Sequence, residues 1–208
     1  MLASSSLTYS YAGGPLLSFP DISVEPDSCL LILGESGSGK TTLLQIIAGM
    51  LPPKSGEISV AGKSLYTLSN AERDQFRGRQ MGLVFQKSLF IESLTVIQNL
   101  QAAAFFAGKT LSRSEGEHLL ERLNINDKAD SLPQRLSVGE QQRAGIAAAL
   151  VNEPQIILAD EPTSALDDIH AEAVYNLLTE EANRLQAALV VVTHDQRLKD
   201  KIQQTLSL

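Results

Sequence analysis

The stretch GESGSGKT at residues 34–41 constrains the fold of this chain more than any other. It fits the pattern G-x-x-x-x-G-K-[ST], directly after the apolar run LLIL and directly before the amphipathic run TTLLQIIAG. Such glycines let backbone N–H groups point inward around an anion, and the helix N-terminus adds the positive end of its dipole. The sequence therefore predicts a strand, a phosphate-binding loop and a helix in succession, rather than a plain glycine-rich turn.

The residues of this stretch and the threonine after it are candidate ligands of a nucleotide. Lys40 is expected to reach the outer phosphates, and the Thr41 hydroxyl is expected to bind Mg²⁺. The full candidate set is Gly34, Glu35, Ser36, Gly37, Ser38, Gly39, Lys40, Thr41 and Thr42.

Short apolar runs of β type recur along the chain with helical patterns between them, which predicts a mainly parallel sheet with helices on its faces. These runs lie at 29–33, 82–85, 156–159 and 189–193. The N-terminal stretches LTYSYAGG, LLSFPDISVEP and GEISVAG carry β-type residues interrupted by Gly and Pro, and they predict an antiparallel lobe. Residues 89–150 have a helical pattern with one expected break at 124–133.

Composition limits the classes of partner and compartment. The net charge of -7 and the pI near 5.0 argue against a nucleic-acid or anionic-membrane partner bound through bulk charge. Cys29 is the only cysteine, so a disulfide framework is excluded and a reducing compartment is expected. No apolar run approaches the roughly 18 residues of a spanning helix, and the N-terminus lacks a secretory leader pattern. We therefore expect a cytoplasmic protein whose role at a membrane would need a partner.

Several polar side chains follow the predicted strands at the sheet edge where open parallel sheets bind their ligands. In QIILADEP, Asp160 is placed to hold Mg²⁺ through water, and Glu161 is placed to face an attacking water. Taken in isolation, this stretch reads as a solvated turn, but beside a phosphate loop it predicts hydrolysis. Gln86 and His194 also follow strands; each alone would be an ordinary loop amide or a structural histidine.

The stretch LSVGEQQR at 136–143 has the pattern of a helix start. Ser137 followed three residues later by Glu140 is a capping box, in which each side chain satisfies a backbone N–H. Gly139 is unexplained by this reading, because glycine in a helix costs about 1 kcal/mol relative to alanine. A glycine at this position indicates a close approach by another group.

Taken together, GESGSGKT, Gln86, LSVGEQQR, ADEP, SALD and His194 occur in the order found in ATPase subunits of ABC transporters, and the chain resembles that family over essentially its whole length. The resemblance implies a P-loop NTPase of α/β class, with a mainly parallel core sheet, an N-terminal antiparallel β lobe and an inserted helical subdomain. It implies a single domain over 1–208, with the core at about 1–88 and 151–208 and the helical subdomain at about 89–150.

The same resemblance implies roles for individual residues. Two copies pair head to tail, so that Ser137 and Gly139 of one copy contact the γ-phosphate on the phosphate loop of the other. Gln86 senses Mg²⁺ and the attacking water and adjoins a membrane partner, Asp167 crosses the dimer interface, and His194 contacts the γ-phosphate. Tyr11 resembles the aromatic residue that stacks on adenine, although Tyr9 is close by and both also read as ordinary strand aromatics.

Three positions depart from the family pattern. The family usually has glycine in place of Val138 and arginine in place of Ala148. Valine resists positive φ, so ATP-driven pairing is weakened if the contact needs that backbone shape; alternatively, the position is simply helical. The runs LPPKSGEISVAGKSL, LSNAERDQFRGRQMGLVFQ and SLTVIQNL resemble the subfamily of lipoprotein-release, macrolide-export and cell-division ATPases, which commonly has glutamate in place of Gln98.

The function implied is that of a subunit that binds and hydrolyses ATP with Mg²⁺, dimerises on ATP and drives an integral membrane permease in export or extraction. Such a subunit lies in the cytoplasm, peripheral on the inner face of the cell membrane. A mechanical or regulatory ATPase of a membrane complex, as in cell division, is the alternative. A soluble relative in DNA repair or translation usually has a coiled-coil insertion or two cassettes, which this chain lacks. The tail after His194 leaves no room for an added regulatory domain, and substrate and direction cannot be read from the sequence.

Overall fold

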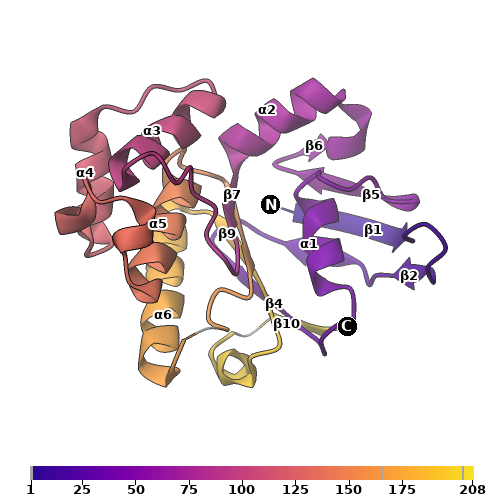
Figure 1. Cartoon of the computed structure of the whole chain (residues 1–208). Coiled ribbons are helices and arrows are strands. Elements are labelled where there is room, and N and C mark those ends of the chain that lie inside the picture. Colours follow the sequence, from indigo (N-terminus) through magenta and orange to yellow (C-terminus); the bar gives the residue numbers. More distant parts are fainter. Residues whose placement is uncertain (1, 165, 203) are drawn as a thin grey trace.

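The computed structural model describes residues 2–164, 166–202 and 204–208, and these ranges contain two sheets with six α-helices around them (Figure 1). The strands are β1 (Leu2–Tyr9), β2 (Leu17–Ser18), β3 (Ile22–Val24), β4 (Cys29–Leu33), β5 (Ser55–Val60), β6 (Lys63–Ser64), β7 (Met81–Val84), β8 (Ile156–Asp160), β9 (Ala188–Thr193) and β10 (Gln204–Ser207). The α-helices are α1 (Lys40–Ile47), α2 (Asn70–Gln80), α3 (Val96–Phe106), α4 (Arg113–Arg122), α5 (Val138–Leu150) and α6 (Asp168–Leu185). Ala165, within the stretch SALD, lies outside the described residues.

The larger sheet has the strand order β10-β4-β9-β8-β7, and every neighbouring pair is parallel. Its three central strands are almost entirely buried, as expected for a parallel sheet covered on both faces. The four strands that apolar runs predicted are confirmed. β10 was not predicted, because it is an edge strand with three of its four residues exposed and therefore has no apolar run.

The smaller sheet is the antiparallel lobe that the N-terminal stretches predicted. It has the order β2-β1-β5-β6, and β3 also pairs with β1. Side chains of β1 alternate between buried and exposed, with Leu2 and Leu7 in the core. The register between β1 and β5 shifts between Ser5 and Thr8, and Ser6 there has a φ of 51°. This bulge bends the lobe around α1.

The helical pattern over 89–150 corresponds to α3, α4 and α5, which lie together on one side of the molecule (Figure 1). The predicted start at residue 89 was wrong, because Thr95 caps α3 in a capping box with Gln98 and the residues before it are not helical. Gln98 thus performs the capping function that a glutamate performs elsewhere. The segment also breaks between α3 and α4, where Gly108 has a φ of 75°. Only the break before α5 was predicted.

Two apolar clusters pack on opposite faces of the parallel sheet. One joins the sheet to α3, α4, α5 and α6, and the other joins it to α1 and the antiparallel lobe. Strand β4 contributes to both, because Leu31 and Leu33 face the first cluster and Leu30 and Ile32 face the second. The phosphate loop follows β4 directly, so its starting point is fixed from both faces.

A buried carboxylate connects two helices from distant parts of the chain. Glu181 of α6, whose side chain is 7% exposed, accepts from Arg122 Nε of α4 at 3.1 Å and from Arg184 Nε at 3.0 Å. Two partners offset the loss of hydration of this carboxylate. The pair between Arg122 and Glu181 therefore ties α4, which packs against α3, to α6.

Candidate active site

The phosphate loop runs from the end of β4 into the first turn of α1. Gly39, the residue before α1, has a φ of 96°, which strongly favours glycine. A Cβ atom there would lie 3.3 Å from both Leu17 and Phe19, so space also favours glycine. Helix α1 has neither a side-chain cap nor an acidic residue in its first turn. Its first backbone N–H groups are thus available to a phosphate.

Lys40 closes the phosphate loop on itself. Its Nζ donates to the Gly34 carbonyl at 2.9 Å and to the Glu35 carbonyl at 2.8 Å, and its side chain is only 7% exposed. The same Nζ lies 4.0 Å from Glu161 Oε1. A second polar group of the loop, the buried Ser38 Oγ, has no hydrogen-bond partner among the described residues. The loop therefore holds one cation, Lys40, at a cavity, and this arrangement suits an anion.

A cavity of about 920 Å³ opens over this loop, within the size range of small-molecule sites. It brings together most of the predicted nucleotide-binding residues with all three candidate catalytic residues of the strand ends. Its lining residues are Tyr11, Pro15, Leu17, Glu35, Ser36, Gly37, Gly39, Lys40, Thr41, Thr42, Gln86, Glu161 and His194. Gly34 and Ser38 belong to the same loop without lining the cavity.

Tyr11 and Tyr9 are distinguished by the cavity. Tyr11 lines it, is 52% exposed and has its hydroxyl 3.0 Å from Thr42 Oγ1. Tyr9 packs edge to face against Tyr11, with the ring centroids 4.9 Å apart, and does not line the cavity. The geometry thus favours Tyr11 over Tyr9 as the residue that contacts the adenine ring of a nucleotide.

Asp160 lies at the end of β8 beside the first turn of α1. Thr41 Oγ1 donates to Asp160 Oδ1 over a long 3.4 Å. Burial raises the pKa of the Asp160 carboxyl, and the nearby charge of Glu161 raises it further, whereas the Thr41 hydrogen bond and the Lys40 charge lower it. The Thr41 hydroxyl and the Asp160 carboxylate are thus close enough to act together as oxygen ligands of a metal ion.

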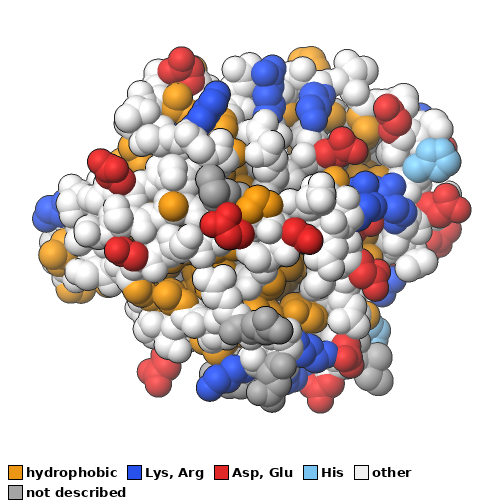
Figure 2. Space-filling view, turned by 180° about the vertical axis from the view of Figure 1, so that it is seen from behind, with side chains coloured by type: hydrophobic (Ala, Val, Ile, Leu, Met, Phe, Trp, Pro, Cys, Tyr) orange, Lys and Arg blue, Asp and Glu red, His pale blue; other side chains and the backbone are white. Residues whose placement is uncertain are grey.

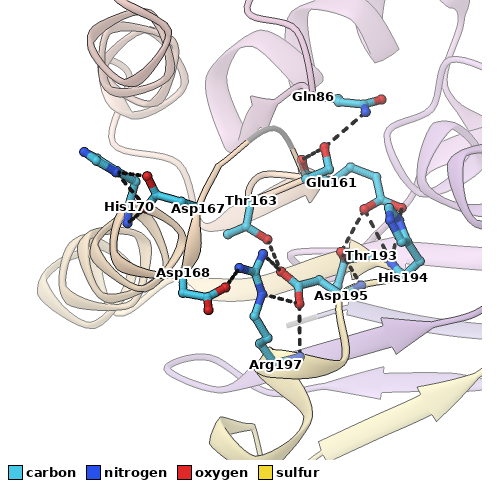
Figure 3. A network of polar contacts seen from close by, with 11 residues as sticks. Gln86, Glu161, Thr163, Asp167, Asp168, His170, Thr193, His194, Asp195 and Arg197 are labelled. Carbon is cyan, nitrogen blue, oxygen red and sulfur yellow. Dashed lines mark hydrogen bonds and ion pairs between the residues drawn. The ribbon is translucent and has the colours of Figure 1, made fainter.

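Glu161 is the most constrained side chain of the site (Figure 3). Its backbone has a φ of 48°, in the left-handed region that non-glycine residues rarely adopt. Its carboxylate accepts from Thr193 Oγ1 at 2.8 Å and from the His194 backbone N–H at 3.2 Å, and it lies 2.9 Å from His194 Nδ1. The side chain is 12% exposed, so these partners hold it at the rim of the cavity.

Gln86 reaches the same loop from β7. Its Nε2 donates to Ser164 Oγ at 3.1 Å, and Ser164 Oγ in turn donates to the Glu161 carbonyl at 3.1 Å (Figure 3). The carboxyl ends of β7, β8 and β9 thus bring Gln86, Glu161 and His194 together, as expected for a parallel sheet.

Besides Gly34, Ser38 and Asp160, three further predicted residues do not line this cavity. Ser137 caps α5 in a complete capping box: its Oγ accepts from the Glu140 N–H at 3.4 Å, and its own N–H donates to Glu140 Oε2 at 2.7 Å. A Cβ atom on Gly139 would meet nothing within 4 Å. Asp167 caps α6, where its carboxylate accepts from the His170 N–H at 2.9 Å. These groups therefore lie outside the cavity of the same copy.

The backbone of Val138, the first residue of α5, is helical and has no positive φ within this copy. Its side chain is 62% exposed at the start of the helix. The alternative reading, that the position is simply helical and tolerates valine, agrees with the structure.

Sequence reasoning missed the groups that hold the strand-end loops. Thr193 donates to Glu161, and Asp195 accepts from Thr163 Oγ1 at 2.9 Å and from Arg197. The only local signal was the run of polar residues after β9. Their partners in the loop after β8 are about thirty residues away in sequence, so that signal does not identify them.

Comparison with known proteins places the chain in a family. The family model described as "ABC transporter" matches residues 18–164. A lipoprotein-releasing system ATP-binding protein LolD from Shewanella oneidensis is 40% identical over 195 residues, covering 93% of this chain and 85% of that protein. The LolD protein of Porphyromonas gingivalis is 38% identical over 180 residues, covering 86% and 82% of the two chains.

Solved structures agree with this assignment. A dimeric post-hydrolysis state of the ATP-binding cassette MJ0796 bound to ADP and Pi has a TM-score of 0.90 at 31% identity, covering 100% of this chain and 94% of that chain. The cbiO1 structure from Clostridium perfringens, described as part of the complex cbiONQ, has a TM-score of 0.82 at 30% identity, covering 93% and 78%. ATP-binding subunits of this family work as dimers with membrane permease partners, as the resemblance implied. The chain therefore belongs to the ABC transporter family, as an ATP-binding subunit that hydrolyses ATP.

Proposed function

We propose that Glu161 is the general base for ATP hydrolysis and that His194 contacts the γ-phosphate. The observation that carries this assignment is the position of the Glu161 carboxylate, between Lys40 Nζ at 4.0 Å and His194 Nδ1 at 2.9 Å on the rim of the cavity. Lys40 and the phosphate loop bind the outer phosphates, and Tyr11 stacks on the adenine. A base next to the cation that binds the reacting phosphate is close to the water that attacks it.

Mg²⁺ fits the oxygen donors beside α1. Thr41 Oγ1, the Asp160 carboxylate and the amide oxygen of Gln86 would hold it, Asp160 through water. Among the described residues no group of three His, Cys, Asp or Glu side chains could hold a metal. This agrees with the preference of Mg²⁺ for one or two carboxylates plus phosphate oxygens and water. When bound, the ion would neutralise charge on the phosphates.

The contacts of Glu161 fix the direction of its carboxylate. An ionised carboxylate that accepts from Thr193 and from the His194 backbone has a fixed direction, and the His194 ring shares one of its oxygens. To act as a base, Glu161 must exchange part of these contacts for the attacking water. We expect His194 to turn toward the γ-phosphate as this exchange occurs.

We propose a composite site between two copies paired head to tail. Ser137 and Gly139 of one copy would contact the γ-phosphate on the phosphate loop of the other, and Asp167 would lie at the interface. Support comes from the exposed start of α5, where a Cβ atom added to Gly139 would meet no other part of the described chain within 4 Å. Loss of the γ-phosphate removes the ligand that joins the two copies, so hydrolysis reopens the pair.

The permease partner would contact a groove of about 440 Å³ beside the Gln86 loop. The groove lies between α2, β7, α3 and α5, and Leu89 and Phe106 on its wall are 72% and 75% exposed. Large exposed apolar side chains around a groove are typical of a protein contact. In the described part of the chain no helix is long and apolar enough to cross a membrane. We propose that this contact holds the protein on the inner face of the cell membrane.

We propose that the permease extracts lipoproteins or exports a related apolar cargo, since the LolD proteins are named for lipoprotein release and match most of this chain. On the face seen in Figure 2, Lys and Arg alternate with Asp and Glu rather than forming a field of one sign. The cargo itself would be recognised by the permease and not by this subunit.

The assignment of the base is tested with Glu161→Gln, with the exposed Glu180→Gln as the matched control. We expect Glu161→Gln to bind ATP, to hydrolyse it at least about 100-fold more slowly and to accumulate as a dimer on size-exclusion chromatography. Steady-state phosphate release measures turnover. Unchanged turnover in Glu161→Gln would contradict the role of Glu161.

The membrane role is tested by pull-down of tagged Glu161→Gln from mildly solubilised membranes with ATP, followed by mass spectrometry. We expect a multi-spanning protein with a large extracytoplasmic domain in a stoichiometric amount, and much less of it with Phe106→Ser. Depletion of the subunit should then leave lipoproteins in the inner membrane. Recovery of a cell-division complex would replace the transport role with a mechanical one, and recovery of soluble proteins alone would contradict both.

A further inference from the structure

Four polar side chains that have no role in the chemistry above join the loop after β8 to the loop after β9. Thr163 lies in the loop after β8, Asp195 and Arg197 follow β9, and Asp168 is the first residue of α6. Figure 3 shows them converging below Glu161 and to the left of His194. Thr163 is fully buried, and the Asp195 side chain is 8% exposed, so the centre of this network is shielded from water.

Asp195 is the hub of the network. Its Oδ1 accepts from Arg197 Nε at 2.8 Å, and its Oδ2 accepts from the terminal Arg197 nitrogen at 2.6 Å and from Thr163 Oγ1 at 2.9 Å. The hydrogen bonds from Arg197 are the main reason why the pKa of Asp195 falls to about 2. A two-pronged contact between guanidinium and carboxylate fixes direction as well as charge.

Arg197 also reaches a third segment. Its remaining terminal nitrogen contacts the Asp168 carboxylate, and Asp168 is the first residue of α6, next to Asp167. One guanidinium therefore holds the loop after β9 and the start of α6 together. The Arg197 side chain is 41% exposed, so it can be replaced without opening the core.

The network continues to the proposed base. The Asp195 backbone N–H donates to Thr193 Oγ1 at 3.0 Å, and Thr193 Oγ1 donates to Glu161 Oε2 at 2.8 Å. His194, between these two residues in the chain, contacts the other carboxylate oxygen. Thr193 is fully buried, so a displacement of Asp195 alters the hydrogen bonds that orient Glu161.

We propose that Arg197 is a positioning residue for ATP hydrolysis, which fixes the loop of His194 and Glu161 and ties that loop to the start of α6. This inference depends on the proposed roles of Glu161 and His194. Arg197 touches neither the cavity nor the phosphate loop. Its loss therefore affects the hydrolytic step and leaves nucleotide affinity in place.

The test compares Arg197→Ala with Arg122→Ala in steady-state ATP hydrolysis. Both arginines contact a shielded carboxylate and have similar exposure, 41% and 38%, but Arg122 is paired with Glu181 far along α6. We expect Arg197→Ala to lower kcat about 10-fold with the KM for ATP changed less than about twofold. Arg122→Ala should leave kcat within about twofold. Equal kcat values for the two variants overturn the inference.

Two further variants separate positioning from folding. Arg197→Lys keeps the charge but not the two-pronged contact, so we expect it to restore the thermal unfolding temperature while kcat stays at least about threefold low. Asp168→Asn leaves the contact with Asp195 intact, and we expect a smaller loss of kcat in the same direction. If Arg197→Ala fails to fold, Asp168→Asn becomes the test. An unchanged kcat in that variant would contradict a role for the contact between Arg197 and the start of α6.

These experiments distinguish a wrong role for Arg197 from a wrong role for Glu161 as the general base. If Glu161→Gln keeps its turnover, the role of Glu161 is wrong whatever Arg197 does. If Glu161→Gln is inactive and Arg197→Ala matches Arg122→Ala, the role of Glu161 stands and only the role of Arg197 is lost. A rise in the KM of Arg197→Ala equal to its fall in kcat also contradicts positioning, because nucleotide binding would then be disturbed.

Discussion

Helix α1 starts with its backbone N–H groups uncapped, whereas α5 starts under a complete capping box. The glycine before α1 is held at a φ of 96° against Leu17 and Phe19, and the glycine in the first turn of α5 is in open space. Helices α2, α3 and α4 carry capping boxes as well, and Asp167 caps α6 with its side chain, so among the described α-helices only α1 lacks a side-chain cap. One helix end is shaped for an anion in its own copy. The other is closed by the capping box of Ser137 and Glu140.

The largest effect is expected where α1 holds its anion. Lys40→Ala removes the cation and the two hydrogen bonds to the carbonyls of Gly34 and Glu35, so turnover should fall at least about 100-fold. Phosphate release and nucleotide titration measure this loss, with the exposed Lys54→Ala as the control. Retained binding and turnover in Lys40→Ala would mean that α1 is no special anion site.

The shape of the α1 start is tested with Gly39→Ala. The added Cβ meets Leu17 and Phe19 at 3.3 Å in a left-handed backbone, and we expect ATP affinity to fall about 10-fold. Gly62→Ala is the matched control, since Gly62 has a φ of 76° and open space around it. Both variants should lose about 1 kcal/mol of unfolding free energy. Equal nucleotide affinity in both would show that only backbone strain, and no phosphate contact, depends on Gly39.

The cap of α5 is compared with an equivalent cap elsewhere. Ser137→Ala and Ser112→Ala each remove the serine of a capping box, and each should lower the unfolding free energy by about 1 kcal/mol. Only Ser137→Ala should also lower turnover, by about fivefold, because in the proposed pair Ser137 also contacts the γ-phosphate bound by the other copy. Parallel assays of melting and phosphate release check this. The same turnover in both variants would mean that Ser137 only caps α5.

The smallest effect is expected at Val138. The residue is helical and its backbone is not strained, so Val138→Gly should change turnover by less than about twofold and should not stabilise the protein. Val138→Ala is the control for the loss of the side chain without added backbone freedom. A clear rise in turnover with glycine alone would restore the strain that the sequence suggested.

Prediction from sequence succeeded where the signal lies within one short stretch. The phosphate loop, the carboxylates after β8 and the capping box of α5 each depend on residues next to one another. The prediction missed strand β10 because an exposed edge strand carries no apolar run. It placed the start of α3 too early because the apolar residues before Thr95 resemble one face of a helix. The network around Asp195 could not be predicted, because its hydrogen bonds join loops about thirty residues apart.

Helix α6 is anchored near both of its ends, which gives it a mechanical property. Asp168 at its start contacts Arg197 of the loop after β9, and Glu181 thirteen residues later contacts Arg122 of α4. At 1.5 Å per residue these anchors are about 20 Å apart along a stiff rod. A push on the first anchor therefore reaches the helices α3, α4 and α5 without passing through the sheet. In the proposed mechanism, the helix would connect the place where phosphate is lost to the side of the molecule where Phe106 is exposed.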